Sequence, residues 1–473
     1  MVEGVVAAVD LGATSGRVML GTAGPNVLRL REVARFPNGP MPAGGQLHWD
    51  ITRLRGAVLD GLALAVRDEP EIASFGIDSW GCDYALVKDG AVLGEPFHYR
   101  DPRNAQAADR VTALVGPQRL YERNGLQFLP FNTLYQLAAE NDLAAPDTML
   151  LIPDLFAFWL TGRGVAERTN ASTTGLLTVS EGEWDDVLIG MLGLPRGLFP
   201  ELVDAGTTIG PVEARVAREL GAGGPIAVTA VGSHDTASAV VAVPATTPDF
   251  AYISCGTWGL VGVETDAPIL SEESRLAGFT NEGGVDGRVR YLHNVMGLWL
   301  LSECVREWER DGSSISVPEL VAQAEAVTEE VPVFDADDET FLAPGEMPAR
   351  IEAWLRAHDL LVPGSRPALV RSILLSLAGT FARTIRTAAS LSGKRVAVVH
   401  VVGGGSQNAL LCRLIADATG LPVVAGPVEA TAIGNVLVQA RAAGYVAGDL
   451  ETLRALVVAA FPVVRYEPRG SRG

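Results

Sequence analysis

Lysine is nearly absent from this chain. Only Lys88 and Lys394 occur, so arginine supplies almost all of the positive charge. The P-loop motif GxxxxGK[ST] needs its lysine, and the surroundings of Lys394, LSGKR, lack both the first glycine and the Ser or Thr that follows. Nothing in the chain matches the strand that carries the essential lysine of protein kinases either. The sequence therefore excludes a P-loop enzyme and a protein kinase.

Cysteines and long apolar runs are also scarce. The four cysteines lie far apart and form no CxxC pair, so reduced thiols are expected rather than a zinc site or a disulfide framework. No uninterrupted apolar run approaches the ~18 residues of a transmembrane helix. The N-terminus lacks the basic segment that begins a signal peptide. These absences predict a cytoplasmic protein.

Acidic residues outnumber basic ones, and the net charge is −19 over 473 residues. Such a surface repels phosphate backbones and anionic lipids, which argues against nucleic-acid or membrane partners. A chain of this length that is 48% hydrophobic predicts two domains, each with its own core. The segment 244–248, PATTP, is the best boundary, because two prolines precede an abrupt return of strand character. We therefore expect domains at 1–243 and 249–473.

The clearest local pattern is VVAAVDLGATSGRVML, residues 5–20, which predicts a strand, a tight turn and a second strand. Gly12 and Gly16 permit a turn whose backbone amides converge on an anion, and Asp10 ends the first strand. A similar pattern recurs at 251–263, around the turn CGTWG. One such unit opens each half, which indicates a duplicated α/β architecture.

A third glycine turn, residues 403–406, joins an apolar strand at 396–402 to a helix at 407–419. The helix presents N-terminal amides to a ligand, but Asn408 occupies the third glycine position of a Rossmann fingerprint. Three such turns suit a nucleotide in a cleft between the domains. With so little lysine, amides, hydroxyls and Mg²⁺ would hold the phosphates, and Asp10 is placed to hold Mg²⁺ through water. The alternative for Asp10 is a strand-end residue that accepts a turn hydrogen bond.

Asp235 is the strongest candidate for chemistry. It lies in the segment GSHDT, residues 232–236, between a strand at 225–231 and a helix at 237–243. Its ordinary role would be that of a helix cap, worth ~1 kcal/mol. A hydroxyl that attacks a γ-phosphate needs a positioned carboxylate to accept its proton, and the domain junction is a suitable place for one. His234 beside it is predicted either to bind a polyol or to pack.

The remaining pattern alternates strands and helices. We expect strands at 28–33, 72–77, 84–87 and 422–425, and helices at 52–66, 295–310, 371–391 and 430–443, with a largely helical stretch over 104–162. The hydroxyl-rich segment TNASTT, residues 169–174, is either a binding surface or a solvated connection, and the second is the commoner case. The acidic residues at 335–339 lack EF-hand spacing and predict a solvated loop.

Several of these stretches resemble the FGGY family of carbohydrate kinases, and the resemblance runs nearly end to end. The matching segments are AVDLGATSGRVML (8–20), GIDSWGCDYALV (76–87), HYRDPR (98–103), TNASTTGLL (169–177), GSHDTASAV (232–240), SCGTWGLVGVET (254–265), LHNVMGLWLL (292–301) and VVGGGSQN (401–408). The resemblance implies two actin-like, RNase H-like ATPase domains around a cleft. It also implies ATP-dependent phosphorylation of a small ketose, L-rhamnulose at O1.

The resemblance also implies roles for single residues. Asp235 resembles the catalytic base. The positions that resemble ATP contacts are Ala13, Thr14, Ser15, Gly16, Arg17, Thr257, Gly403, Gly404 and Gly405. The positions that resemble sugar contacts are Gly81, His234, Asp235, Thr236 and Asn294. Ser302 departs from the pattern, because the family often has glutamine there and a serine side chain is shorter.

Two alternatives stay open at this point. An actin-like or Hsp70-like ATPase would share the fold and the phosphate turns without needing a sugar pocket. Other FGGY kinases act on L-fuculose, L-ribulose or xylulose, and the sequence alone does not place hydroxyl groups accurately enough to choose among these ketoses.

Overall fold

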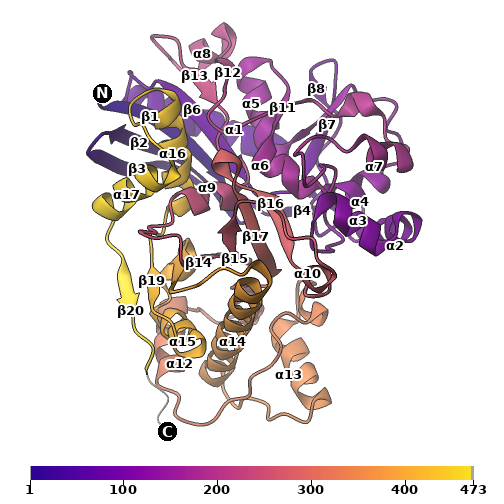
Figure 1. Ribbon diagram of the computed structural model, residues 1–473, viewed down its shortest axis with the longest axis vertical. Coiled ribbons are helices and arrows are strands. Elements are labelled where there is room, and N and C mark those ends of the chain that lie inside the picture. Colours follow the sequence, from indigo (N-terminus) through magenta and orange to yellow (C-terminus); the bar gives the residue numbers. More distant parts are fainter. Residues whose placement is uncertain (1, 470–473) are drawn as a thin grey trace. The chain divides into compact units, whose positions relative to one another are not determined.

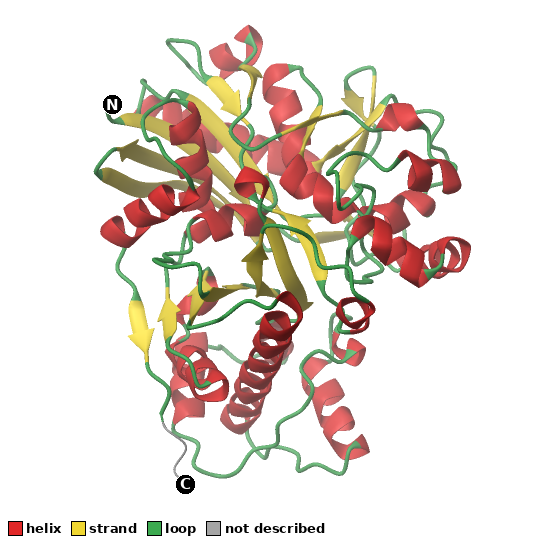
Figure 2. Cartoon of the chain, viewed as in Figure 1, coloured by secondary structure: helices red, strands yellow, loops and turns green. Residues whose placement is uncertain are grey.

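The computed structural model describes residues 2–469 and has an α/β architecture with two large mixed sheets (Figures 1 and 2). These residues form two compact units. The first contains the chain up to Thr246 together with Glu264–Tyr291 and Ala430–Ala460. The second contains Thr247–Val263, Leu292–Glu429 and the chain from Phe461 onward. The first division falls inside the expected boundary at 244–248, but the units are discontinuous, unlike the expected domains 1–243 and 249–473. The expected cleft between domains stays a prediction.

The first sheet has six strands in the order β12-β13-β6-β1-β2-β3. Their bounds are β1 Gly4–Leu11, β2 Ser15–Gly24, β3 Val27–Pro37, β6 Ser74–Ser79, β12 Thr208–Pro211 and β13 Ala227–Thr229. β1 pairs in parallel with β6, and β6 with β13, whereas the hairpin β1-β2-β3 is antiparallel. β1 lies inside the sheet and is apolar almost throughout, as is usual for a strand covered on both faces.

The second sheet has the order β16-β17-β15-β14-β18-β19-β20. Its strands are β14 Phe250–Cys255, β15 Gly259–Thr265, β16 Thr280–Gly283, β17 Val289–Val295, β18 Val398–Val402, β19 Val423–Ala425 and β20 Val464–Tyr466. Here too an antiparallel hairpin, β14-β15, adjoins a parallel set, β14-β18-β19, with an antiparallel strand beyond it. The repeated strand pattern confirms the duplicated architecture and both predicted hairpins.

Three small sheets contain the other strands of residues 2–469. They pair β4 Pro40–Ala43 with β5 Gln46–Trp49, β10 Val165–Glu167 with β11 Glu201–Val203, and β7 Tyr84–Lys88 with β8 Ala91–Val92 and β9 Thr148–Leu151.

The helices of the first unit are α1 Ile51–Asp68, α2 Arg103–Val115, α3 Pro117–Asn124, α4 Thr133–Ala138, α5 Ile152–Thr161, α6 Arg168–Ala171, α7 Asp186–Met191, α8 Ala214–Glu219, α9 Asp235–Val241, α10 Glu272–Leu276, α16 Ala430–Ala442 and α17 Leu450–Ala460. Those of the second unit are α11 Trp299–Arg310, α12 Val317–Glu325, α13 Met347–Ala357, α14 Arg366–Ser392 and α15 Ala409–Thr419.

The stretch 104–162 is largely helical, as expected, although its apolar segment Thr148–Leu151 forms β9 and pairs with β7. The helix expected from Val295 begins at Trp299 instead, since Val295 still belongs to β17. The turn between them carries Gly297 with φ 33°, where an added Cβ would lie 2.4 Å from the carbonyl carbon of Trp258.

Helix α16 explains why the units are discontinuous. It packs on β1, β6 and α9, all of the first unit. Asn435 donates to the carbonyl oxygen of Gly76 on β6, and Gln439 donates to that of Ala7 on β1. At Gly434 an added Cβ would lie 1.8 Å from the carbonyl oxygen of Ser238, so α16 approaches α9 backbone to backbone. A segment late in the sequence therefore completes the core of the first unit.

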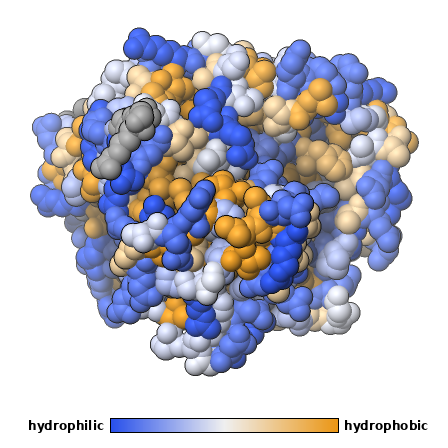
Figure 3. All heavy atoms as spheres, turned by 90° about the horizontal axis from the view of Figure 1, so that it is seen from below, coloured by the Kyte–Doolittle hydropathy of each residue, from blue (hydrophilic) through white to orange (hydrophobic). Residues whose placement is uncertain are grey.

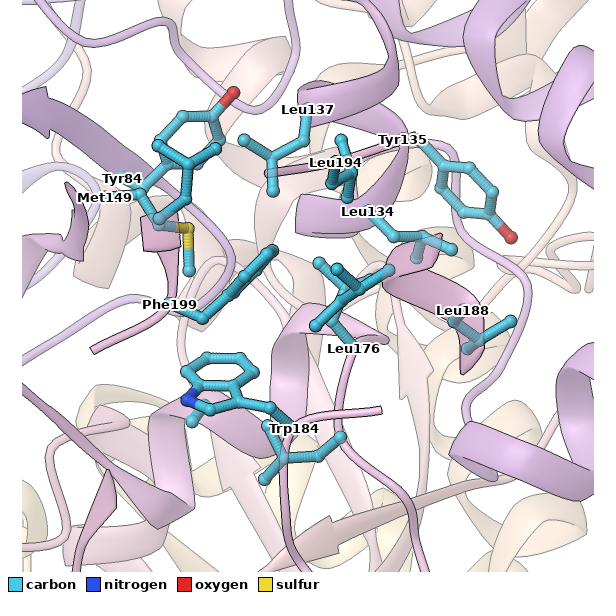
Figure 4. Close-up of a cluster of buried hydrophobic side chains, with 14 of the residues drawn as sticks. Tyr84, Leu134, Tyr135, Leu137, Met149, Leu176, Trp184, Leu188, Leu194 and Phe199 are labelled. Atoms are coloured by element: carbon cyan, nitrogen blue, oxygen red, sulfur yellow. The ribbon is translucent and has the colours of Figure 1, made fainter. Parts of the chain in front are cut away.

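A separate apolar cluster supports the small sheet of β7 and β9 (Figure 4). The ring of Phe199 lies beside that of Trp184, with their centroids 5.0 Å apart, and Tyr84 and Met149 extend the cluster. Tyr84 directly follows the segment Gly81–Asp83, so this core anchors one end of that loop.

Within residues 2–469, α14 is the one helix long and apolar enough to cross a bilayer by length and composition, and 78% of its most apolar window is buried in the protein. Burial of this kind is typical of a core helix. The four cysteines are buried and unpaired, as predicted. Figure 3 shows a face on which apolar residues lie among hydrophilic ones.

Candidate active site

The carboxyl ends of three parallel strands place acidic residues at one edge of the first sheet. Asp10 near the end of β1 lies directly opposite Asp78 near the end of β6. Beyond β13, the carbonyl oxygen of Ser233 accepts a hydrogen bond from the amide of Ser79 at 2.9 Å, and His234 and Asp235 follow. Ligands of open α/β sheets bind at this edge. The structure thus brings Asp10 and Asp235 together, and adds Asp78.

Asp235 does not cap its helix. The N-cap of α9 is His234, whose side chain makes no capping hydrogen bond, and Asp235 is the first helical residue. Its Oδ1 accepts a hydrogen bond from Thr236 Oγ1 at 3.1 Å, and its side chain is 30% exposed. Partial burial raises the pKa of Asp235, and the charge of Asp10 adds to this shift. The capping explanation therefore fails, and a carboxylate with a raised pKa is left facing the sheet edge.

Asp78 is the most deeply buried of the three acids. It is fully buried, its Oδ2 accepts a hydrogen bond from Asn435 at 2.5 Å, and its Oδ1 has no hydrogen-bond partner among the described residues. Burial first, and then the charge of Asp10, raise the pKa of Asp78 well above its ordinary value.

Asp10 is held by Arg17, across the hairpin β1-β2. Arg17 Nε donates to Asp10 Oδ2 at 2.9 Å. No cluster of three or more His, Cys, Asp or Glu residues that could hold a metal ion occurs within 2–469. Mg²⁺ in nucleotide sites often uses only one or two carboxylates together with phosphate oxygens and water. Asp10, with the unpartnered Oδ1 of Asp78 opposite, fits that donor set.

The first glycine turn is fixed by hydrogen bonds from its own chain neighbourhood. The amide of Gly12 donates to the carbonyl oxygen of Ser15 at 3.0 Å, and Asn38 Nδ2 donates to the carbonyl oxygen of Gly12 at 2.8 Å. Gly16 is buried against Phe36, where an added Cβ would lie 2.2 Å from the ring. Of the expected ATP positions 13–17, Thr14 is therefore the exposed tip, while Gly16 shapes the turn.

Gly81 lies between Thr173 and His234. A Cβ at residue 81 would lie 3.0 Å from Thr173 Oγ1 and 3.4 Å from His234 Nε2. The next residue, Cys82, has φ 73°, and its amide donates to Thr173 Oγ1 at 3.1 Å. Two expected sugar contacts, Gly81 and His234, are thus neighbours, and the loop that carries Gly81 is tied to the segment TNASTT.

Asp83 fixes the other side of this loop. Its Oδ2 accepts hydrogen bonds from Trp49 Nε1 at 2.6 Å and Trp80 Nε1 at 3.0 Å, and its Oδ1 accepts one from Gln136 at 2.8 Å. Burial raises the pKa of Asp83 to about 6, although these hydrogen bonds favour its charged form.

The segment TNASTT is not a solvated connection. It forms α6 and a 3₁₀ turn, and Thr169, Asn170, Thr173 and Thr174 are buried. The reason is that its hydroxyl groups bond locally; Thr174 Oγ1, for example, donates to the carbonyl oxygen of Ala171. The commoner expectation for this segment is therefore wrong.

Glu167 links this segment to His234 and Asp235. It is 1% exposed, and its carboxylate accepts hydrogen bonds from the amide and hydroxyl of Thr169 and from the amide and hydroxyl of Ser233. One buried carboxylate thereby fixes the backbone that leads into His234 and Asp235.

A buried ion pair lies on the other side of His234. Glu282 on β16 and Arg290 on β17 are 2.9 Å apart, and Arg290 is fully buried. Arg290 Nη2 lies 3.1 Å from His234 Nδ1. Burial tends to raise the pKa of Glu282, but the charge of Arg290 opposes this, and the pKa lies below its ordinary value.

The second unit brings together the two remaining glycine turns. Thr257 lies between β14 and β15, and a Cβ at Gly405 would lie 2.3 Å from Cys255 Sγ, at the end of β14. The N-terminal amides of Leu298 and Trp299 donate to the carbonyl oxygens of Gly256 and Thr257. Thr257, Gly403, Gly404 and Gly405 therefore belong to one local surface. Asn294 lies on β17, and Ser302 is exposed in α11.

Sequence reasoning missed four polar residues of the first unit, Asp78, Glu167, Glu282 and Arg290. Asp78 follows a predicted strand as Asp10 does, which was a usable signal. The other three carry no motif, because their partners lie 66, 48 and 56 residues away or are set by sheet pairing.

Comparison with known proteins places this site in a family. The profile of the N-terminal domain of the FGGY family of carbohydrate kinases matches residues 5–242, and that of its C-terminal domain matches residues 251–443. This chain belongs to the FGGY family of carbohydrate kinases. Kinases of this family use ATP as phosphoryl donor, so the alternative of a sugar-independent ATPase is set aside.

Curated relatives of this FGGY kinase cover almost its full length. The chain is 41% identical over 468 residues to a rhamnulokinase of Bacteroides thetaiotaomicron, covering 98% of this chain and 95% of the relative. It is 42% identical over 474 residues to a rhamnulokinase of Pectobacterium carotovorum, covering 98% and 93%.

Solved structures confirm the fold. A xylulose kinase of Lactobacillus acidophilus superposes with a TM-score of 0.80 at 16% identity, over 98% of this chain and 94% of the other. A glycerol kinase of Plasmodium falciparum superposes with a TM-score of 0.76 at 14% identity, over 98% and 94%.

Proposed function

We propose that this FGGY kinase transfers the γ-phosphoryl group of ATP to O1 of L-rhamnulose, which yields L-rhamnulose 1-phosphate. The name shared by its full-length relatives at about 40% identity supports this substrate. The proposed chemistry rests on the position of Asp235. Its carboxylate does not cap helix α9, and it lies near Asp10 at the edge of the first sheet.

Asp235 is proposed as the general base. It accepts the proton of the attacking hydroxyl, and burial raises its pKa, which makes the carboxylate a stronger base. Thr236 orients the carboxylate through its hydrogen bond to Oδ1. Gly81, His234, Thr236 and Asn294 are proposed to contact the sugar.

The nucleotide is proposed to use amides and hydroxyls in place of lysine. Residues 13–17, Thr257 and Gly403–Gly405 are the proposed contacts. Asp10 would hold Mg²⁺ through water, and the ion would neutralise charge on the transferred phosphoryl group. Arg17 holds the carboxylate of Asp10 in place.

A coupled ADP-release assay across ketoses tests the substrate. L-rhamnulose, L-fuculose, L-ribulose and D-xylulose are compared at matched concentrations, with a no-sugar reaction as the blank. We expect the highest kcat/KM for L-rhamnulose, and ADP release that depends on sugar. A higher kcat/KM for one of the other three ketoses would replace the proposed substrate while leaving the kinase activity intact.

A further inference from the structure

His234 presents its two ring nitrogens to different surroundings. Nδ1 faces the buried pair of Arg290 and Glu282, at 3.1 Å from Arg290 Nη2 and 3.2 Å from Glu282 Oε2. Nε2 faces Gly81 and Asp235. The side chain of His234 is 9% exposed, so the protein rather than solvent determines which nitrogen carries the proton.

Arg290 determines whether Nδ1 of His234 carries a hydrogen. A guanidinium group only donates hydrogen bonds and keeps its charge, so Nδ1 must accept from Nη2 and carries no hydrogen of its own. The guanidinium is fixed, because Nε also donates to the carbonyl oxygen of Gly283 at 2.9 Å and Nη1 lies 2.9 Å from Glu282 Oε2. Glu282 Oε2 also lies 3.2 Å from Nδ1, but the positive charge of Arg290, 3.1 Å from the same nitrogen, disfavours a proton there.

The Nε2 side has no hydrogen-bond acceptor among the described residues. Its shortest contact with an acid is 3.5 Å, to Asp235 Oδ1, which exceeds the usual length of such a bond. Residue 81 adds no side chain in front of it, whereas a Cβ there would lie 3.4 Å away. A neutral ring with its proton on Nε2 therefore directs an unsatisfied N–H toward the space beside Asp235.

We propose that the ion pair of Arg290 and Glu282 holds His234 as the neutral tautomer protonated on Nε2, and that this N–H donates to an oxygen of the bound sugar. The proposal deepens the function above and rests on a sugar binding beside Asp235. Arg290 and Glu282 are then positioning residues: they set the donor that selects a sugar with an acceptor oxygen at this point.

Nuclear magnetic resonance of the full chain, labelled with ¹⁵N-histidine and free of sugar, tests the tautomer. The chain has six histidines, and the His234 signals are identified by their loss in His234→Gln. We expect proton coupling to Nε2 and an unprotonated Nδ1 between pH 7 and 8. A proton on Nδ1, alone or in an imidazolium ring, would overturn the proposal whether or not L-rhamnulose is the substrate.

A charge-free double variant tests the role of the pair. Arg290→Met with Glu282→Leu removes both charges, so neither partner is left buried and unpaired. We expect mixed tautomers of His234 and roughly a tenfold rise in KM for the best ketose of the panel, the loss of about one hydrogen bond, with KM for ATP unchanged. An unchanged tautomer, or an unchanged KM for the sugar, contradicts the proposal.

The matched control is a second ion pair of the same unit. Arg103 and Glu140 are 3.2 Å apart and 12% and 15% exposed. Arg103→Met with Glu140→Leu removes the same charges away from His234. It is expected to leave both the His234 spectrum and the KM for sugar at the wild-type values. A tenfold rise in KM in the control as well would assign the effect to general destabilisation and overturn the positioning role.

Discussion

In the first unit, single buried acidic residues hold the segments of the proposed site in place. Asp83, Glu167 and Glu282 are each nearly inaccessible, and each holds a segment that carries a proposed sugar or catalytic residue. Buried carboxylates are costly unless several donors satisfy them, so their presence around one site indicates that the backbone there is held in a single arrangement.

Asp83 predicts a pH-dependent stability. Its pKa rises through burial from 3.8 to about 6, so the folded chain binds the proton more tightly than the unfolded chain does. This contribution is complete below pH 3.8 and is lost as the pH rises through 6, which amounts to about 3 kcal/mol. In Asp83→Asn this dependence disappears. The free energy of unfolding by urea, measured at pH 4 and pH 7, should therefore fall more between these values for wild type than for the variant.

The comparison uses the difference between the two proteins, because other acids titrate in the same window and are common to both. Parallel curves for wild type and Asp83→Asn would show that Asp83 has an ordinary pKa.

Gly81 predicts a defect in sugar binding. In Gly81→Ala the new Cβ enters the space between Thr173 and His234, so we expect roughly a tenfold or larger rise in KM for the ketose, with little change in KM for ATP. Steady-state kinetics with each substrate varied in turn measures both values. Gly223→Ala, whose Cβ would meet no atom within 4 Å, is the matched control. Equal sugar KM values in wild type and Gly81→Ala would remove Gly81 from the sugar site.

At this scale the sequence predicted residues that sit in local motifs and missed those that do not. Asp235, His234 and Gly81 stand in short segments rich in glycine and polar residues. Arg290 stands in an alternating strand, VRYLHNV, where nothing distinguishes a fully buried arginine from an exposed one. Its role depends on sheet pairing and on a histidine 56 residues away.

Helix α9, which begins with Asp235, is held at both ends. Glu167 fixes the backbone before it through Ser233, and Arg454 of α17 donates to the carbonyl oxygen of Val240 at its C-terminal end at 3.0 Å. Arg454 is also paired with Glu264, and both are about 5% exposed or less. A helix of seven residues has little stability of its own, so these contacts determine its position.

Because α9 and α16 are in close contact, one methyl group added between them should lower the stability of the fold strongly. In Gly434→Ala the Cβ would lie 1.8 Å from the carbonyl oxygen of Ser238, and both atoms are fixed to helix backbones. The helices must separate, which should cost about 1–3 kcal/mol or more and lower the urea midpoint. Gly56→Ala in α1, where nothing lies within 4 Å, should instead match or exceed wild type, because alanine favours helix. A wild-type midpoint for Gly434→Ala would contradict the close approach of α9 and α16.

Elements with strong local patterns were predictable, and those set by partners were not. Both hairpins, β1-β2 and β14-β15, follow from apolar runs that flank glycine turns. The short helix α6 was missed, because its hydroxyls look solvated until Glu167 and the backbone carbonyls that bind them are known. Strand β9 was missed since a four-residue apolar run between helices is ambiguous without β7 beside it.

For the whole molecule, the duplicated strand pattern, the family and the first division within residues 244–248 were readable from sequence, but the return of a late segment to the first unit was not. Segment Ala430–Ala460 joins the first unit because Asn435 and Gln439 bond to β1 and β6, a pairing across more than 350 residues that no local pattern encodes. The first unit therefore holds Asp10, Gly81, His234 and Asp235 on a core that the late helix α16 completes.

The central claim is that Asp235 removes the proton from the attacking sugar hydroxyl. Asp235→Asn keeps the size of the side chain and a carbonyl oxygen for Thr236, but it cannot act as a base. The most direct measurement is kcat for L-rhamnulose, or for the best ketose of the panel, together with the Kd for ATP by calorimetry. The account predicts a fall in kcat of about 10²–10⁴-fold with the ATP Kd nearly unchanged. A variant that retains most of the wild-type kcat would contradict it.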